Sequence, residues 1–167
     1  LRQSFIERLL LHHGVPDGEA ESAASEAFAA FLSQRHAVVL YDNAQSVLKT
    51  LGRKFQLGAL TNGNADVRKT EIGSCFDYAW RAEEFGVSKP DPALFHRAFD
   101  AAGVSAGEVI HIGDCHDNDV SGAISAGAKA IWFTPDGGTS EIASGVVKDL
   151  SELPAAIERL TSNKGLI

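Results

Sequence analysis

The sequence predicts an α/β protein built on a doubly wound parallel sheet, with a helical segment ahead of it. From about residue 38 onward, short apolar runs alternate with amphipathic stretches of helical period, a pattern typical of β-α-β units. Polar residues directly follow several of these runs, at the ends of strands where such sheets bind ligands. Before residue 36 the apolar pattern is helical.

The first segment, to about residue 35, predicts a helical hairpin whose turn is Gly-Val-Pro-Asp-Gly at 14–18. Helical spacing relates the apolar residues on each side of this turn. They are Phe5, Ile6, Leu9 and Leu10 in the first stretch and Ala23, Ala27, Ala30 and Phe31 in the second.

The alternating region predicts strands at residues 56–60, 78–80, 109–112 and 129–133. Helices are predicted at residues 45–51, 92–102, 120–126 and 154–160. Asp91 has the position of an N-cap before Pro92, and Gly103 and Gly127 fit helix C-termini.

Composition excludes several classes of protein. A chain of 167 residues with 44% hydrophobic content can bury one core. Its net charge of -7 and scattered basic residues argue against nucleic-acid binding, and no apolar run approaches the roughly 20 residues that span a bilayer. Two cysteines are too few for a disulfide framework, so we expect a reducing, cytoplasmic location.

Three polar clusters follow or flank the predicted strands. Residues 61–64, Thr-Asn-Gly-Asn, combine a hydroxyl, a glycine turn and a following helix start, which suits a phosphoryl oxygen. An ordinary strand-to-helix turn capped by Asn64 explains the same residues.

Lys89 stands in the second cluster, Ser-Lys-Pro-Asp-Pro at 88–92, where a fixed ammonium could neutralise a phosphoryl group. A surface lysine ahead of a helix is the ordinary alternative.

The third cluster, residues 113–119, holds Asp114, Asp117 and Asp119 within six positions. Such crowded carboxylates repel one another unless a cation compensates, and oxygen ligands suit Mg²⁺. We expect Asp114 to be buried at the strand end and to bind metal, and Asp117 to be a helix N-cap. His116 is expected to face solvent and His111 to pack on a face of the sheet.

The order Thr-Asn-Gly at 61–63, Lys-Pro at 89–90 and Gly-Asp-x-x-x-x-Asp at 113–119 resembles motifs two, three and four of the haloacid dehalogenase superfamily. The resemblance covers nearly the whole chain. It implies a Rossmann-like core at residues 37–167 and a remnant of a helical cap domain at residues 1–36. It also implies that Thr61, Asn62 and Gly63 bind the phosphoryl group.

By the same resemblance, Lys89 would bridge the phosphoryl group to the nucleophile, Asp114 would coordinate Mg²⁺, and Asp119 would orient a metal-bound water or Lys89. The family's first motif, an apolar strand ending in Asp-x-Asp-x-Thr or Val, has no match. Its nearest candidate, residues 38–44, has Asp42 but Ala44 in place of the acid/base, and we expect a loop there.

We therefore expect the first motif upstream of residue 1, in a longer polypeptide. In the family its strand is central, so two neighbouring strands would be left with unpaired edges. The resemblance implies a Mg²⁺-dependent phosphomonoesterase acting through an aspartyl-phosphate on a small phosphorylated metabolite, most similar to flavin-pathway phosphatases. The alternatives are a 2-haloacid dehalogenase, a receiver-like phospho-accepting domain and a catalytically inactive fragment.

Overall fold

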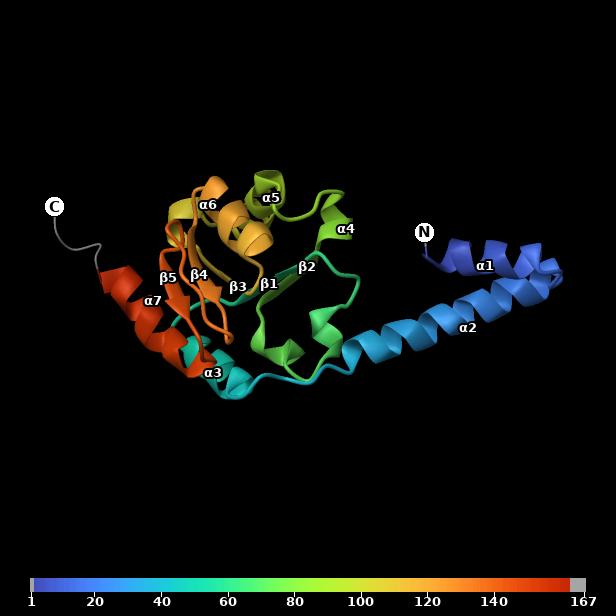
Figure 1. Ribbon diagram of the computed structural model, residues 1–167, viewed down its shortest axis with the longest axis horizontal. Helices are drawn as coiled ribbons and strands as arrows, with labels where there is room; N and C mark the ends of the chain where they lie inside the picture. Colours follow the sequence, from blue (N-terminus) through green and yellow to red (C-terminus); the bar gives the residue numbers. More distant parts are fainter. Residues whose placement is uncertain (1, 163–167) are drawn as a thin grey trace. The chain divides into compact units, whose positions relative to one another are not determined.

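The computed structural model describes residues 2–162, which form two units that divide between Val39 and Leu40 (Figure 1). The first unit is the predicted helical hairpin, α1 (Arg2–His12) and α2 (Asp17–His36). Gly14, with φ of 83°, supplies a left-handed turn residue that a side chain would oppose.

The buried stripe of α2 differs from the predicted one. Ala20 and Ala24 are fully buried, whereas the predicted Ala23, Ala27 and Ala30 are exposed. The segment has alanines on several faces, so the apolar period alone could not select the face that packs. On α1, Phe5 and Leu9 are exposed.

The second unit alternates strands and helices, as the sequence predicts. Its parallel strands form two groups, one of β1 and β2 and one in the order β3-β4-β5. The strands are β1 (Gly58–Thr61), β2 (Tyr78–Arg81), β3 (Ile110–Gly113), β4 (Lys129–Phe133) and β5 (Gly145–Val147). The helices are α3 (Ala44–Leu51), α4 (Ala82–Phe85), α5 (Pro92–Ala102), α6 (Gly122–Ser125) and α7 (Leu153–Ser162).

Several predicted boundaries are confirmed and others shift. The helix at 92–102 and the strand at 129–133 match, and the Asp91 side chain caps α5 by accepting from the Ala93 amide at 2.9 Å. The predicted helix at 120–126 instead begins as a π-helical segment, His116–Ser121, which continues into α6. Strand β5 was not predicted, because three residues beginning with glycine carry little periodic signal.

Helices cover both faces of the sheet, and each face has its own apolar core. On one face α3 and α7 pack against Ile131 and Phe133 of β4. On the other, α5 and α6 pack against Ala130, whose side chain points opposite to that of Ile131 because successive residues of a strand alternate. The core is therefore the doubly wound α/β arrangement that the sequence predicts.

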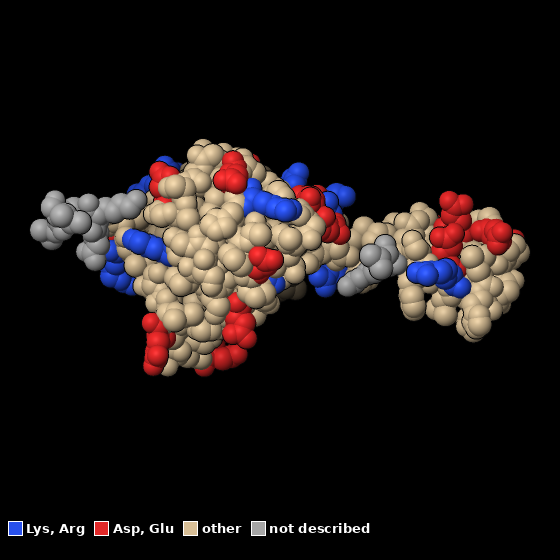
Figure 2. All heavy atoms as spheres, turned by 90° about the horizontal axis from the view of Figure 1, so that it is seen from above, with Lys and Arg blue, Asp and Glu red and all other residues tan. Residues whose placement is uncertain are grey.

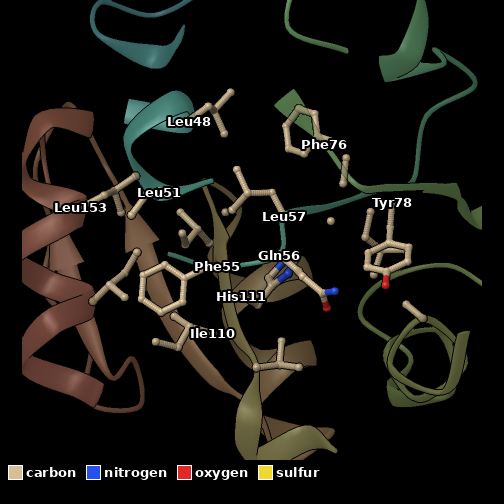
Figure 3. Close-up of a pocket in the computed structure, with 18 of the residues that line it drawn as sticks. Leu48, Leu51, Phe55, Gln56, Leu57, Phe76, Tyr78, Ile110, His111 and Leu153 are labelled. Carbon is tan, nitrogen blue, oxygen red and sulfur yellow. The ribbon is translucent and has the colours of Figure 1, made fainter. Parts of the chain in front are cut away.

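A cavity of about 780 Å³ lies between β1 and β3. Residues 58–60 of β1 and 110–113 of β3 line it, and Figure 3 shows Leu51 of α3 and Leu153 of α7 beside it. Within residues 2–162, no strand pairs with the edges of β1 and β3 that border this cavity. The sheet is thus interrupted where the central first-motif strand was expected, which agrees with the prediction that this strand is missing.

Two further features concern the expectations about membrane spans and about nucleic-acid binding. Between residues 2 and 162, no helix is both long and apolar enough to cross a membrane. On the face drawn in Figure 2, Lys and Arg side chains are separated by neutral surface and by Asp and Glu side chains, rather than gathered in one patch.

Candidate active site

The predicted site residues come together at the carboxyl edge of the sheet. Strand β1 ends at Thr61 and β3 at Gly113, so the loops that follow these strands open at the same edge. Lys89, from the loop before α5, reaches β1, where its ammonium donates to the Leu60 carbonyl at 3.0 Å. The same ammonium donates to Oδ1 of Asp119 at 2.6 Å. Residues from three separate segments of the chain therefore meet at one point.

Asp119 is the buried charge of this edge. Asp119 is 4% exposed. Its Oδ1 accepts a hydrogen bond from Lys89, and its Oδ2 accepts one from the Cys115 amide at 3.0 Å. His111 lies with Nε2 at 3.0 Å from Oδ1 of Asp119. Burial by itself would raise the pKa of Asp119, but the hydrogen bonds from His111 and Lys89 outweigh it and lower the pKa to about 2. The carboxylate is therefore ionised throughout the physiological range.

Gly113 gives Asp119 its room. A Cβ built on Gly113 would lie 2.2 Å from Cγ of Asp119, so no larger residue fits at the end of β3 without moving that carboxylate. The π-helical segment that begins at His116 brings Asp119 back to the end of the strand. There the Asp119 amide donates to the Cys115 carbonyl at 2.8 Å. The glycine of the Gly-Asp motif is thus required by the aspartate five residues after Asp114.

The side chain of Asn62 joins the loop after β1 to the segment that holds Lys89. Its side chain donates to the Lys89 carbonyl at 2.9 Å and accepts from the Lys89 amide at 2.7 Å. Thr61 uses its hydroxyl oxygen to accept from the Gly63 amide at 2.9 Å, so that amide serves the turn. The hydroxyl proton of Thr61 stays available as a donor, because a hydroxyl that accepts one bond can still donate another.

Asp114 differs from its prediction. The sequence suggested a buried aspartate, but Asp114 is exposed, in the connection between the last residue of β3, Gly113, and the π-helical segment that begins at His116. Its backbone is nevertheless held in place, since the indole of Trp132 on β4 donates to the Asp114 carbonyl at 2.9 Å.

Of two further expectations for the loop, one is wrong and the other holds only in part. Asp117 is no N-cap, because it lies inside the π-helical segment with a side chain that is 95% exposed, and Cys115 occupies the cap position. His116 does not face solvent freely. Its Nε2 lies 2.8 Å from the Ser140 hydroxyl, and its ring packs edge-on against Trp132. The loop is thus braced against β4 and the segment that follows β4.

Sequence reasoning missed His111 as a member of the site. It predicted only packing on the sheet, and the ring does pack edge-on against Phe95, with centroids 5.1 Å apart. The contact with Asp119 depends on the π-helical segment folding back, which no local pattern reveals. The sole hint was an imidazole in an otherwise apolar strand.

Comparison with known proteins identifies similar chains. The family described as haloacid dehalogenase-like hydrolase matches residues 2–127. The chain is 35% identical over 133 residues to 5-amino-6-(5-phospho-D-ribitylamino)uracil phosphatase YigB of Escherichia coli, covering 80% of this chain and 56% of that protein. It is 34% identical to the phosphoserine phosphatase of Thermus thermophilus, over 77% of this chain and 54% of that protein. The chain thus spans little more than half the length of these relatives.

Among solved structures, the fold is similar to that of a 2-haloacid dehalogenase from Pseudomonas syringae pv. Tomato. The TM-score is 0.90 and the identity 37%, covering 95% of this chain and 70% of that one.

Proposed function

Because this chain belongs to the haloacid dehalogenase-like hydrolases, we propose that it is part of a Mg²⁺-dependent phosphatase that hydrolyses a small phosphorylated metabolite. The observation that carries the proposal is the buried contact of Lys89 with Asp119 at the carboxyl edge of the sheet, 2.6 Å between Nζ and Oδ1. A cation fixed by a buried carboxylate suits a site in which negative charge is transferred.

In this proposal the phosphoryl group binds at the end of β1. Thr61 donates its hydroxyl proton to a phosphoryl oxygen, and Asn62 contributes its backbone N–H, since its side chain is committed to Lys89. Gly63 shapes the turn by donating its amide to Thr61. The Lys89 ammonium has three N–H donors, and its bonds to Asp119 and the Leu60 carbonyl use two of them. The third is directed to the phosphoryl group.

The metal proposal rests on the donor chemistry of Asp114. The described residues contain no group of three or more His, Cys, Asp or Glu side chains that could hold a metal ion together. Mg²⁺ commonly takes only one or two protein carboxylates and completes its shell with water and substrate phosphate, so a single exposed Asp114 fits as one ligand. Bound there, Mg²⁺ would neutralise charge on the phosphoryl oxygens. Asp119, whose carboxylate is bonded to Lys89, would orient the Lys89 ammonium and would not bind the metal directly.

The nucleophile is proposed to lie on a strand that fills the cavity between β1 and β3. A carboxylate at the carboxyl end of that strand would arrive beside Lys89, which lines the cavity. Its oxygen would attack phosphorus while the bond to the ester oxygen breaks, and the second carboxyl group of the same motif, two residues on, would give its proton to the leaving alcohol. Water would then hydrolyse the aspartyl-phosphate, releasing phosphate and restoring the carboxylate. Without such a strand, residues 1–167 alone are expected to show no turnover.

Similarity to the Escherichia coli phosphatase supports a flavin-pathway substrate, FMN or a ribitylamino-uracil phosphate. A second candidate, 2-haloacid dehalogenase, is favoured by the 37% identity to the Pseudomonas syringae structure. The two differ in their need for metal. Asp114, exposed at the edge of the sheet, favours the phosphatase, because a metal-independent dehalogenase has no use for a free carboxylate there.

The test restores the strand. A synthetic peptide with an apolar strand ending in Asp-x-Asp-x-Thr is added to the chain, and release of phosphate from FMN and from p-nitrophenyl phosphate is measured with Mg²⁺ and with EDTA. We expect phosphate release that needs the peptide and Mg²⁺ and is lost in Lys89→Met. The matched control is Asp117→Asn, which removes an exposed carboxylate of the same loop and should retain activity. Metal-independent halide release from 2-chloropropionate would instead establish the dehalogenase.

A further inference from the structure

His111 is the group at this site to which neither the resemblance nor the proposed reaction gives a role. It lies on β3 with a side chain that is 15% exposed, among the residues that line the cavity (Figure 3). Its imidazole touches two partners. The ring meets Phe95 edge-on at an interplanar angle of 86°, and Nε2 lies 3.0 Å from Oδ1 of Asp119.

The chemistry of the partner fixes the proton on His111. An ionised carboxylate only accepts hydrogen bonds, so the hydrogen between the two groups must be on Nε2. Oδ1 of Asp119 then accepts from both His111 and Lys89, while Oδ2 accepts from the Cys115 amide. The carboxylate is therefore held by three donors from three segments of the chain. They are His111 on β3, Lys89 in the loop before α5, and the Cys115 amide just before the π-helical segment.

Each of these donors constrains a different motion. The Cys115 amide holds Oδ2, but a carboxylate held at one oxygen can still turn about that contact. Lys89 reaches Oδ1 through a long stem with several rotatable bonds, and its ammonium is shared with the Leu60 carbonyl, so it fixes the orientation of the carboxylate less closely than a short side chain would. His111 is different, because its short side chain has only two rotatable bonds and its ring packs edge-on against Phe95, so its N–H has less freedom than the Lys89 ammonium. Of the two donors to Oδ1, His111 is therefore the more rigid one.

We propose that His111 is a positioning residue, whose Nε2–H holds the Asp119 carboxylate in the one orientation that sets the Lys89 ammonium at the phosphoryl site. What Lys89 does there rests on the proposed function, but the positioning itself does not. Loss of this donor lets the Asp119 carboxylate turn and the ammonium drift. The residue acts through Asp119 and Lys89 and does not touch the substrate.

Two substitutions separate positioning from packing. His111→Phe keeps an aromatic ring against Phe95 but has no donor. His111→Gln loses the ring but carries an N–H at about the place of Nε2. If His111 only fills space, Phe is the milder change. If it positions Asp119, Gln is the milder change.

The readout is hydrogen exchange of the Cys115 amide, measured by NMR on the chain as it is. That amide is protected by Oδ2 of Asp119, so it reports the orientation of the carboxylate without any need for catalysis. We expect exchange about tenfold faster in His111→Phe, since a bond to a charged acceptor is weakened, and close to the original rate in His111→Gln. The Ala93 amide, which donates to Asp91 at 2.9 Å, monitors general destabilisation.

The proposal is overturned if the Cys115 amide is unchanged in His111→Phe, if His111→Gln exchanges as fast as His111→Phe, or if Ala93 accelerates as much as Cys115. A second measurement uses the peptide-complemented protein, where kcat should fall in His111→Phe with KM unchanged and recover in His111→Gln. Absence of phosphatase activity in the unmodified complemented protein would refute the proposed function, while the amide exchange result would still decide the role of His111.

Discussion

Replacing Asp119 with asparagine removes a buried negative charge that the fold keeps ionised far into the acid range. The pKa of this carboxyl is lowered from an ordinary value of 3.8 to about 2, because hydrogen bonds from His111 and Lys89 outweigh the cost of burial. A carboxyl whose folded pKa lies below its unfolded pKa stabilises the fold above the unfolded value. That stabilisation is complete above about pH 5 and is lost progressively as the pH falls toward 2.

The size of the effect follows from the same values. A tenfold difference in acidity constant corresponds to about 1.4 kcal/mol, so a pKa of about 2 against 3.8 contributes roughly 2 kcal/mol to the free energy of unfolding at neutral pH. The variant also leaves the Lys89 ammonium, with a side chain only 12% exposed, without its counter-charge. Breaking a buried pair in this way costs about 3–5 kcal/mol at pH 6.

Urea denaturation between pH 6 and pH 2 measures both the pH-dependent contribution of the Asp119 carboxylate and the cost of breaking its pair with Lys89. We expect the advantage of the unmodified chain over Asp119→Asn to shrink by roughly 2 kcal/mol across this range. Asp117→Asn, at an exposed position of the same loop, should follow the unmodified chain. If Asp119→Asn does not fold, the double variant Lys89→Met with Asp119→Asn removes the carboxylate without stranding the ammonium, and should show the same pH difference. Parallel loss of stability in all these proteins would refute the reasoning, since Asp119 would then titrate as in an unfolded chain.

Three further substitutions test the packing of the site. Gly113→Ala places a Cβ 2.2 Å from Cγ of Asp119, so it should cost about 1–3 kcal/mol in urea and flatten the acid dependence; an unchanged pH profile would contradict this. Asn62→Ala strips two hydrogen bonds from the backbone of Lys89 and should cost about 1–3 kcal/mol, whereas a change below the error of the denaturation curve would show that solvent replaces them. Phe95→Ala empties a fully buried position and should lower unfolding free energy by about 3–5 kcal/mol, with a neutral result contradicting its place in the core.

Much of the fold could be predicted because its signals are local. Helix α5 has an N-cap at Asp91, a proline at its first position and a glycine after its last, and its predicted boundaries match. Strand β4 is a short apolar run whose two faces are both covered, which is the pattern of a buried parallel strand. Capping chemistry and short periodicity suffice for such elements.

What could not be predicted depends on contacts between distant residues. The contact between His111 and Asp119 needs the chain to leave β3 and return to the end of that strand as a π-helical segment. The exposure of Asp114 contradicts the burial predicted from its place at the strand end, and the local sequence does not distinguish it from the buried Asp119, because both are aspartates that follow a strand. Only the return path of the backbone distinguishes them.

The interrupted sheet has a consequence for how this polypeptide behaves among its own copies. Two parallel strand edges that face an apolar cavity offer backbone donors and acceptors to any extended segment, whatever its origin. A neighbouring molecule can present such a segment, so self-assembly should compete with monomeric folding and grow with protein concentration. For residues 1–167 alone, the solubility should therefore fall as the protein concentration rises, and an added segment that pairs with both edges should restore it.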